Sequence, residues 1–231
     1  MKAVKILVCL LAVLVLGVSV SSAQFSVGAD LVSRYLWRGW DFGNSAAVQP
    51  ALAYSAPAGT GSFEIGAWGS FGIAGGIGTS DAYNENDLYA SYSNGPVSVV
   101  FTDYFFPGYS GDDQFDEFGK DGAHILELGA SAGNEIVSGS VYYAFSTPTE
   151  QGIEKSWYLE LGVTPPYEVD DIGISLFIGA GNGFYDFVED GAESKFVISN
   201  LGVTVNRGMF STTWAMNPDQ KTTFLVFMMS L

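Results

Sequence analysis

Apolar residues alternate with small or polar residues along most of this chain. Between residues 25 and 37 the odd positions read Phe, Val, Ala, Leu, Ser, Tyr and Trp, while the even positions include Gly28, Asp30 and Arg34. A period of two is typical of a β-strand, whose successive side chains point to opposite faces. The pattern recurs at residues 48–54, 63–68, 126–131, 137–145, 157–164, 172–179 and 225–231, and less regular runs at 87–93, 97–106, 195–205 and 209–216 bring the total to about twelve predicted strands.

The connections between these strands alternate in length. Long segments such as "WRGWDFGNSA", "AGGIGTSDAYNEN" and "STPTEQGIEK" are interspersed with short ones such as "NGP" and "NRG". Outer-membrane barrels combine an even number of antiparallel strands with short turns at one end and long loops at the other. The polar faces are rich in Gly, Ser and charge, which would fill a closed core poorly but could line a lumen. The sequence therefore predicts an all-β, transmembrane, antiparallel up-and-down barrel of about twelve strands, with its apolar face turned outward.

The first 23 residues have the features of a signal peptide. Lys2 and Lys5 precede an apolar run over residues 6–20, and the small residues 21–23 offer a cleavage site. No other run approaches the 18 apolar residues of a spanning helix. We therefore expect an exported protein with residues 1–23 as signal peptide, residues 24–231 as one barrel domain, and the bacterial outer membrane as its location.

The mature domain is strongly acidic. Without Lys2 and Lys5, seven of the nine basic residues remain against 25 acidic ones, a formal charge of −18. This balance argues against a nucleic-acid partner, because few side chains could neutralise phosphates. It permits cationic solutes or divalent ions. Cys9, the only cysteine, lies in the predicted signal peptide, so disulfides are not expected.

The start of the mature chain resembles a known family. The runs "SRYLWRG", "QPALAYS" and "FEIGAWGS" are similar to the opening of the Gcw_chp family, also described as TorF-type porins, over about residues 25–72. The resemblance implies a Gram-negative outer-membrane barrel that could form a pore.

Six charged residues are expected to line the lumen. A lipid-facing Arg costs about 2–4 kcal/mol at the middle of a bilayer, so the two arginines of the first strand should point inward while Tyr35 and Trp37 face lipid. The lining would select solutes by charge, or its members would pair and close the barrel. Twelve strands do not decide between a filled and an open interior, and the many inward Gly and Ser residues favour a narrow pore. The six residues are Asp30, Arg34, Arg38, Glu64, Glu127 and Glu160; the face of Asp103 is left open.

An acidic loop and the single histidine could carry other functions, cation binding and lipid hydrolysis. An acidic loop offers oxygen ligands for a hard cation, but it lacks the spacing of a calcium loop, so a solvated charge run is favoured over a weak divalent site. His124, the only histidine, would need a nearby serine to serve a hydrolase, and its neighbours supply none; a structural histidine is favoured. The acidic loop residues are Asp112, Asp113, Asp116, Glu117 and Asp121.

The sequence thus favours a porin-like barrel that passes small cationic or neutral solutes passively. Its expected partners are outer-membrane lipids and these solutes; no catalysis and no cofactor are expected, and the oligomeric state is left open. The first alternative is a closed structural or adhesion barrel acting through its acidic loops. The second is a membrane-embedded lipid hydrolase that depends on His124.

Overall fold

The computed structural model describes residues 24–74, 83–107, 115–119, 121–149, 152–166, 170–186 and 194–231. The predicted signal peptide, residues 1–23, lies outside this part of the chain. The strands are β1 (Gln24–Val32), β2 (Leu36–Trp37), β3 (Trp40–Asp41), β4 (Ala47–Ala58), β5 (Gly61–Gly72), β6 (Asn84–Asn94), β7 (Val97–Phe105), β8 (His124–Gly133), β9 (Val137–Thr149), β10 (Gly152–Val163), β11 (Gly173–Gly181), β12 (Val197–Arg207), β13 (Phe210–Asn217) and β14 (Thr222–Ser230), and a 3-10 turn, η2, spans Gly183–Tyr185.

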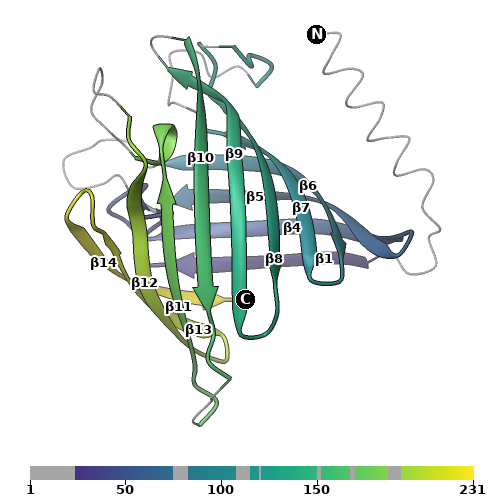
Figure 1. Ribbon diagram of the computed structural model, residues 1–231, viewed down its shortest axis with the longest axis vertical. Coiled ribbons are helices and arrows are strands. Elements are labelled where there is room, and N and C mark those ends of the chain that lie inside the picture. Colours follow the sequence, from purple (N-terminus) through teal and green to yellow (C-terminus); the bar gives the residue numbers. More distant parts are fainter. Residues whose placement is uncertain are drawn as a thin grey trace.

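Twelve of these strands form a closed antiparallel barrel. Its order is β1-β14-β13-β12-β11-β10-β9-β8-β7-β6-β5-β4, so each strand pairs with its neighbours along the wall and the first strand meets the last (Figure 1). Strands β2 and β3 form a separate two-stranded sheet. The predicted twelve-stranded all-β barrel is confirmed. Among the described residues, no helix has the length and apolar character needed to cross a bilayer.

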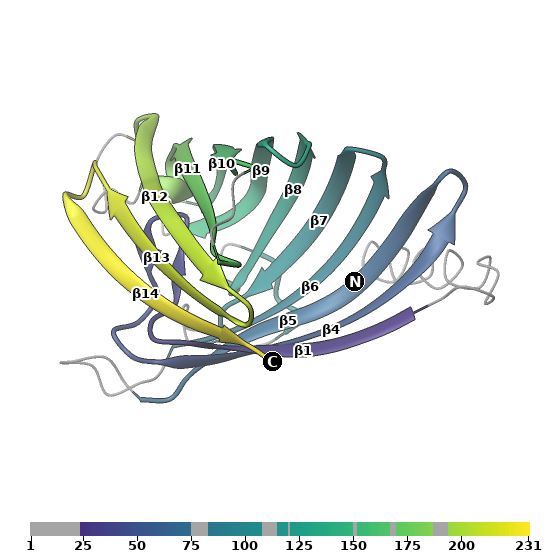
Figure 2. The same cartoon turned by 90° about the horizontal axis from the view of Figure 1, so that it is seen from below.

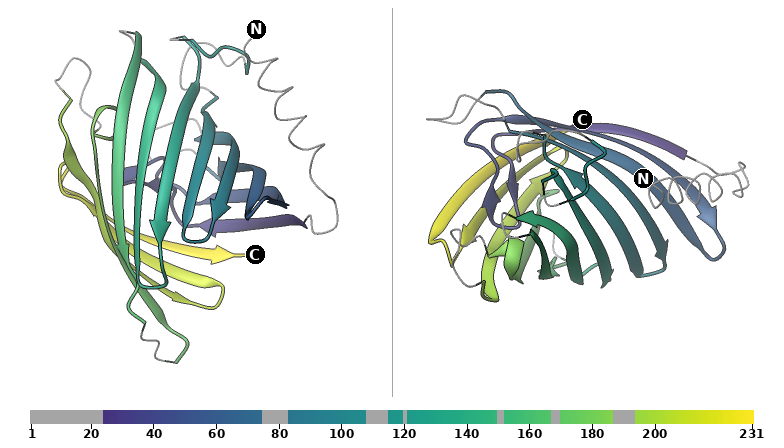
Figure 3. Two further views of the ribbon diagram at one scale, coloured as in Figure 1. Left: turned by 45° about the vertical axis from the view of Figure 1, so that its right-hand side comes forward. Right: turned by 90° about the horizontal axis from the view of Figure 1, so that it is seen from above.

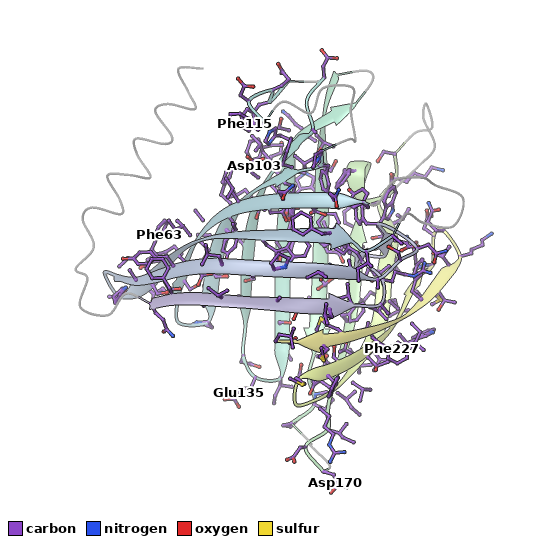
Figure 4. All side chains as sticks on the ribbon, turned by 180° about the vertical axis from the view of Figure 1, so that it is seen from behind. Phe63, Asp103, Phe115, Glu135, Asp170 and Phe227 are labelled. Atoms are coloured by element: carbon purple, nitrogen blue, oxygen red, sulfur yellow. The ribbon has the colours of Figure 1, made fainter. Side chains whose placement is uncertain are left out.

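The outer face of the barrel carries the apolar half of each alternating strand. Val27 is 81% exposed, Leu88 63% and Leu161 60%. Phe63 and Phe227 likewise project from the outside of the wall (Figure 4). The predicted outward direction of the apolar face is therefore correct along the wall strands.

The first strand is shorter than the sequence predicts. It ends at Val32, and the following segment turns away from the wall into the space that the strands enclose (Figure 2). Tyr35 is only 7% exposed and packs among aromatic side chains of the interior. The prediction that Tyr35 and Trp37 face lipid is wrong, because the alternation continues past Val32 in a segment that has left the wall.

Most connections at one end of the barrel are longer than ten residues, and most at the other end are turns of two or three residues. Asp103 and Phe115 lie at one end, whereas Glu135 and Asp170 lie in the turns of the other end (Figure 4). One predicted long loop, "STPTEQGIEK", is largely strand: β9 runs to Thr149 and β10 begins at Gly152. A register shift between Glu154 and Ser156 marks an irregularity of the kind that a bulge produces, and such a strand lacks the strict alternation that the prediction requires.

The wall closes between β1 and β14 over a short distance. β1 pairs with β4 over nine residue pairs but with β14 over only three, from Asp30–Ser230 to Val32–Met228. Backbone hydrogen bonds between Ala29 and Leu231 and from Ser33 N to Phe227 O extend this contact. We call this contact the seam; β1 and β14 both curve away from it (Figure 3).

Candidate functional site in the barrel lumen

The segment between β1 and β4 forms a hairpin inside the barrel. Leu36 pairs with Asp41 and Trp37 with Trp40. Arg38 and Gly39 at the tip both have positive φ, 50° and 86°, as a two-residue hairpin turn of the primed type requires. A Cβ at residue 39 would lie 1.8 Å from the Ser199 carbonyl oxygen, so only glycine lets the tip approach β12 this closely. We call residues 33–46 the lumen hairpin.

Aromatic rings of the lumen hairpin fill the barrel interior at this level. Tyr35 packs 5.6 Å from the Trp68 ring, and Phe42 packs 6.0 Å from Phe106, measured between ring centroids. Trp37 packs 5.5 Å from Tyr104. These contacts join the hairpin to β5, β7 and the residue after β7, so it is held on the inner side of the wall by side chains.

An ion pair anchors the hairpin tip. Arg38 Nη1 donates to Glu127 Oε2 at 2.5 Å and Nη2 donates to Oε1 at 3.1 Å. The two side chains are only 8% and 1% exposed. Tyr104 donates to Glu127 at 2.9 Å, and Tyr185 also donates to it. The carboxylate thus accepts four hydrogen bonds, the number its lone pairs allow.

Aromatic faces surround the Arg38 guanidinium. Its central carbon lies 3.9 Å from the Tyr142 ring centroid, 4.6 Å from Tyr158 and 4.4 Å from Trp37. Such contacts favour a cation, increasingly so when water is excluded. Burial and the charge of Glu127 keep the Tyr185 hydroxyl protonated by raising the pKa of its phenol, although the nearby Arg38 charge opposes this. Tyr185 is therefore a hydrogen-bond donor to Glu127.

The other predicted lining residues are not brought into this ion pair. Asp30 lies on the inner face of β1, opposite Gln49 and Ser230. Arg34 forms its ion pair with Asp41 of the same hairpin, and its guanidinium lies 5.5 Å from the Phe224 ring centroid of β14. Glu64 and Glu160 accept hydrogen bonds from neutral groups of the wall, which are Ser55 and Tyr89 for Glu64 and Tyr158 and Asn200 for Glu160.

Aromatic side chains occupy the space beside the inward glycines. A Cβ on Gly66 would lie 2.4 Å from the Tyr89 ring, and a Cβ on Gly129 would lie 2.6 Å from Tyr142. Gly179 has the same relation to Tyr158, and Gly202 to Phe177. The inference from inward glycines to an open lumen is wrong at these positions, because each glycine accommodates a ring from a neighbouring residue of the wall.

Two acidic side chains that the sequence pattern does not single out lie near the lumen hairpin. Glu85 and Asp87 point inward from β6, and they are 1% and 7% exposed. Burial, the charge of Glu85 and a hydrogen bond to Glu85 raise the pKa of Tyr35, so the Tyr35 hydroxyl stays protonated. A period of two from Glu85 through Tyr89 places them on the inner face, but the polar run "NEN" is typical of a loop and conceals this period.

The structure separates His124 from the lumen. Asp103 is registered with Leu88 and Leu126, which assigns it to the outer face. His124 Nδ1 lies 2.7 Å from Asp103 Oδ1, and Nε2 lies 2.9 Å from the Phe115 carbonyl oxygen. Each ring nitrogen thus lies within hydrogen-bonding distance of an oxygen of Asp103 or Phe115, and neither faces a serine in this conformation.

The acidic loop is described only in part. Asp112 and Asp113 lie outside the described residues. Glu117 accepts a hydrogen bond from Gly119 N at 2.7 Å, and Asp116 is exposed, as is Asp121. In the described parts of the chain, no group of three or more His, Cys, Asp or Glu residues could hold a metal ion. The weak divalent site in this loop stays a prediction.

Comparison with curated proteins finds no match. A family model, by contrast, covers most of the chain: it matches residues 18–225, well beyond the opening runs that carried the resemblance. This chain belongs to that family, which is described as a bacterial protein of unknown function (Gcw_chp).

Proposed function

We propose that this protein is an outer-membrane β-barrel of a Gram-negative bacterium, delivered by its N-terminal signal peptide. The support is the combination of a closed wall with an apolar exterior. A closed barrel satisfies its backbone hydrogen bonds within the wall, as a bilayer requires; in this wall the pairing is short only at the seam. The outward side chains would contact outer-membrane lipids, the first expected partner.

Within that membrane the barrel acts as a narrow channel that the lumen hairpin closes. The observation that carries this proposal is the way the hairpin is attached: Arg38 and Glu127 hold its tip by a side-chain ion pair, and its two strands pair only with each other. Backbone hydrogen bonds join the two ends of the hairpin to the wall, Ser33 to Phe227 and Ala46 to Ile73. The part between these ends can leave the lumen without breaking the backbone hydrogen bonds of the wall. Displacement of the hairpin then opens the passage.

The solutes proposed are small and cationic or neutral. Glu64 and Glu160 line the wall, and in the described part of the chain neither forms an ion pair. Uncompensated carboxylates along a lumen favour cations, as acidic rings do in cation channels. No catalytic step and no cofactor are part of the proposal.

Planar-bilayer recording tests the channel. We expect cations to carry most of the wild-type current. Glu127→Gln removes the charge that holds Arg38, so we expect longer or more frequent openings than in the wild-type barrel. Glu135→Gln makes the same chemical change in an exposed turn and should leave the current unchanged. Wild-type current that is anion-selective would contradict the proposed solute class; Glu127→Gln cannot serve for this test, because it leaves the Arg38 charge unpaired.

A closed structural barrel is the second candidate function. The near-complete burial of Arg38 and Glu127 favours it, because water does not reach this level of the lumen freely. Silent bilayers for the wild type, for Glu127→Gln and for a variant with a shortened hairpin would establish this candidate in place of the channel. The hydrolase alternative predicts lipid cleavage that is lost in His124→Asn; we expect no such cleavage, since the Phe115 carbonyl engages Nε2.

A further inference from the structure

Glu85 and Asp87 are a pair of buried carboxylates next to the lumen hairpin. They lie two residues apart on β6 and therefore share its inner face. Glu85 is registered with Ser70 of β5, and Asp87 with Trp68 of β5 and Tyr104 of β7. The carboxylates are close enough to each other to share a hydrogen bond, and Tyr35 of the hairpin also hydrogen-bonds Glu85. One acidic pair is thus enclosed by the wall and the hairpin.

Both carboxylates keep an unsatisfied oxygen. Glu85 Oε2 and Asp87 Oδ1 are buried and have no hydrogen-bond partner. Among the described residues no Lys, Arg or His pairs with either side chain, since Arg34 pairs with Asp41 and Arg38 with Glu127. A buried carboxylate without a partner is strongly unfavourable. The pair therefore needs a positive species to balance its charge, either a shared proton or a cation that the chain itself does not supply there.

We propose that Glu85 and Asp87 bind a hard divalent cation, Ca²⁺ or Mg²⁺, between β6 and the lumen hairpin. The free oxygens of the two carboxylates are the ligands. The ion displaces the proton of the hydrogen bond between the two groups into solvent, and the two negative charges then match the charge of the ion. Hard ions such as these bind carboxylate, carbonyl and water oxygens, whereas softer metals favour nitrogen and sulfur ligands. No third acidic or histidine ligand joins the pair in the described residues, so the remaining coordination comes from water or neutral oxygen.

Neighbouring groups hold the two ligands in place. The Tyr35 hydroxyl bonds to Glu85 from the hairpin side, and the backbone of Phe105 bonds to Asp87. On the other side of Glu85 lies Ser70, whose Oγ accepts a hydrogen bond from Gln49 Nε2 at 3.2 Å and so keeps its own proton to donate. Because Tyr35 belongs to the hairpin, a cation at this site stabilises the hairpin in its lumen position. The site is independent of whether the barrel conducts.

Isothermal titration of the detergent-folded, chelator-treated barrel with CaCl₂ and with MgCl₂ tests the site. We expect one saturable event for at least one of these ions in the wild type. Each of Glu85→Gln and Asp87→Asn should weaken the binding of the ion, and the double variant should abolish it. Loss of an outer-shell partner costs a metal site about 10- to 100-fold in affinity, and we expect at least this loss for each single variant. Thermal unfolding of the wild type should move to higher temperature with the ion and return after EDTA.

Control variants distinguish this site from ion binding elsewhere on the barrel. Glu135→Gln removes one exposed carboxylate and should titrate like the wild type. A response that survives in the double variant would assign the ion to the acidic loop and overturn the proposal. A wild-type barrel that ignores both ions, even if the double variant is more stable, would also overturn it, because the carboxylates would then share a proton.

Discussion

The ion pair between Arg38 and Glu127 allows a quantitative test of the folded lumen. Glu127 is 1% exposed and accepts hydrogen bonds from Arg38, Tyr104 and Tyr185. In Glu127→Gln the single amide oxygen replaces two acceptors, and Arg38 keeps its charge in a buried position. Removing one member of a buried ion pair costs about 3–5 kcal/mol, whereas an exposed pair contributes only about 0–1 kcal/mol. We expect the larger value.

A double-mutant cycle separates the pair from its surroundings. Arg38→Met should also destabilise the protein, since it leaves the Glu127 charge buried. Replacing both side chains with methionine should cost much less than the sum of the single changes, because no uncompensated charge remains. Urea unfolding in lipid vesicles, followed by tryptophan fluorescence, measures these values, and the lumen hairpin contributes Trp37 and Trp40 to the signal.

Two results would refute the reasoning. Single variants that each cost less than about 1 kcal/mol would mean that the pair is solvated, and the hairpin would then not occupy the lumen. Additive effects of the two substitutions would mean that the side chains do not interact. Glu135→Gln serves as the matched control, with an expected change within about 0.5 kcal/mol.

Three other substitutions test separate parts of the fold. Gly66→Val places a side chain where the Tyr89 ring lies 2.4 Å from the Cβ position; we expect a loss of about 1–3 kcal/mol from overpacking in the same urea assay, reduced in the double variant with Tyr89→Ala. Leu128→Arg, at an outward position that is 53% exposed, should cost about 2–4 kcal/mol in vesicles if it lies near the bilayer midplane, and no loss would argue against insertion. Cysteines at the registered pair Asp30 and Ser230 should form a disulfide on oxidation, visible as a mobility shift on non-reducing gels, and unlinked chains would contradict the closed wall.

The barrel can be predicted from sequence because one pattern determines most of it. Alternation along segments such as residues 157–163 requires a two-faced strand, and the length and number of such segments indicate the strand count. The pattern does not show at which residue a strand leaves the barrel wall. Trp37 continues the alternation of β1, yet it belongs to a hairpin inside the barrel, because its contacts are with Tyr104 and Tyr185 and not with lipid.

The lumen site is predictable only in part. The sequence predicts that the two arginines and Glu127 point into the lumen, and Arg38 does meet Glu127. The partner of Arg38 cannot be chosen from sequence, because the hairpin brings together residues 89 positions apart. The turn itself leaves a signal: an Arg-Gly dipeptide between Trp37 and Trp40 matches the two-residue turns that need positive φ at both central positions. Glu85 is hidden in a run that resembles a loop.

The short seam has a consequence for the lipid around the barrel. From Ala29 to Ser33 the contact with β14 spans roughly five residues, about 17 Å at 3.4 Å per residue. The apolar band of an outer-membrane barrel is about 25 Å tall. In a bilayer, headgroups and water would therefore reach deeper beside β1 and β14 than elsewhere around the circumference, and the membrane would be locally thinned on this one side of the protein.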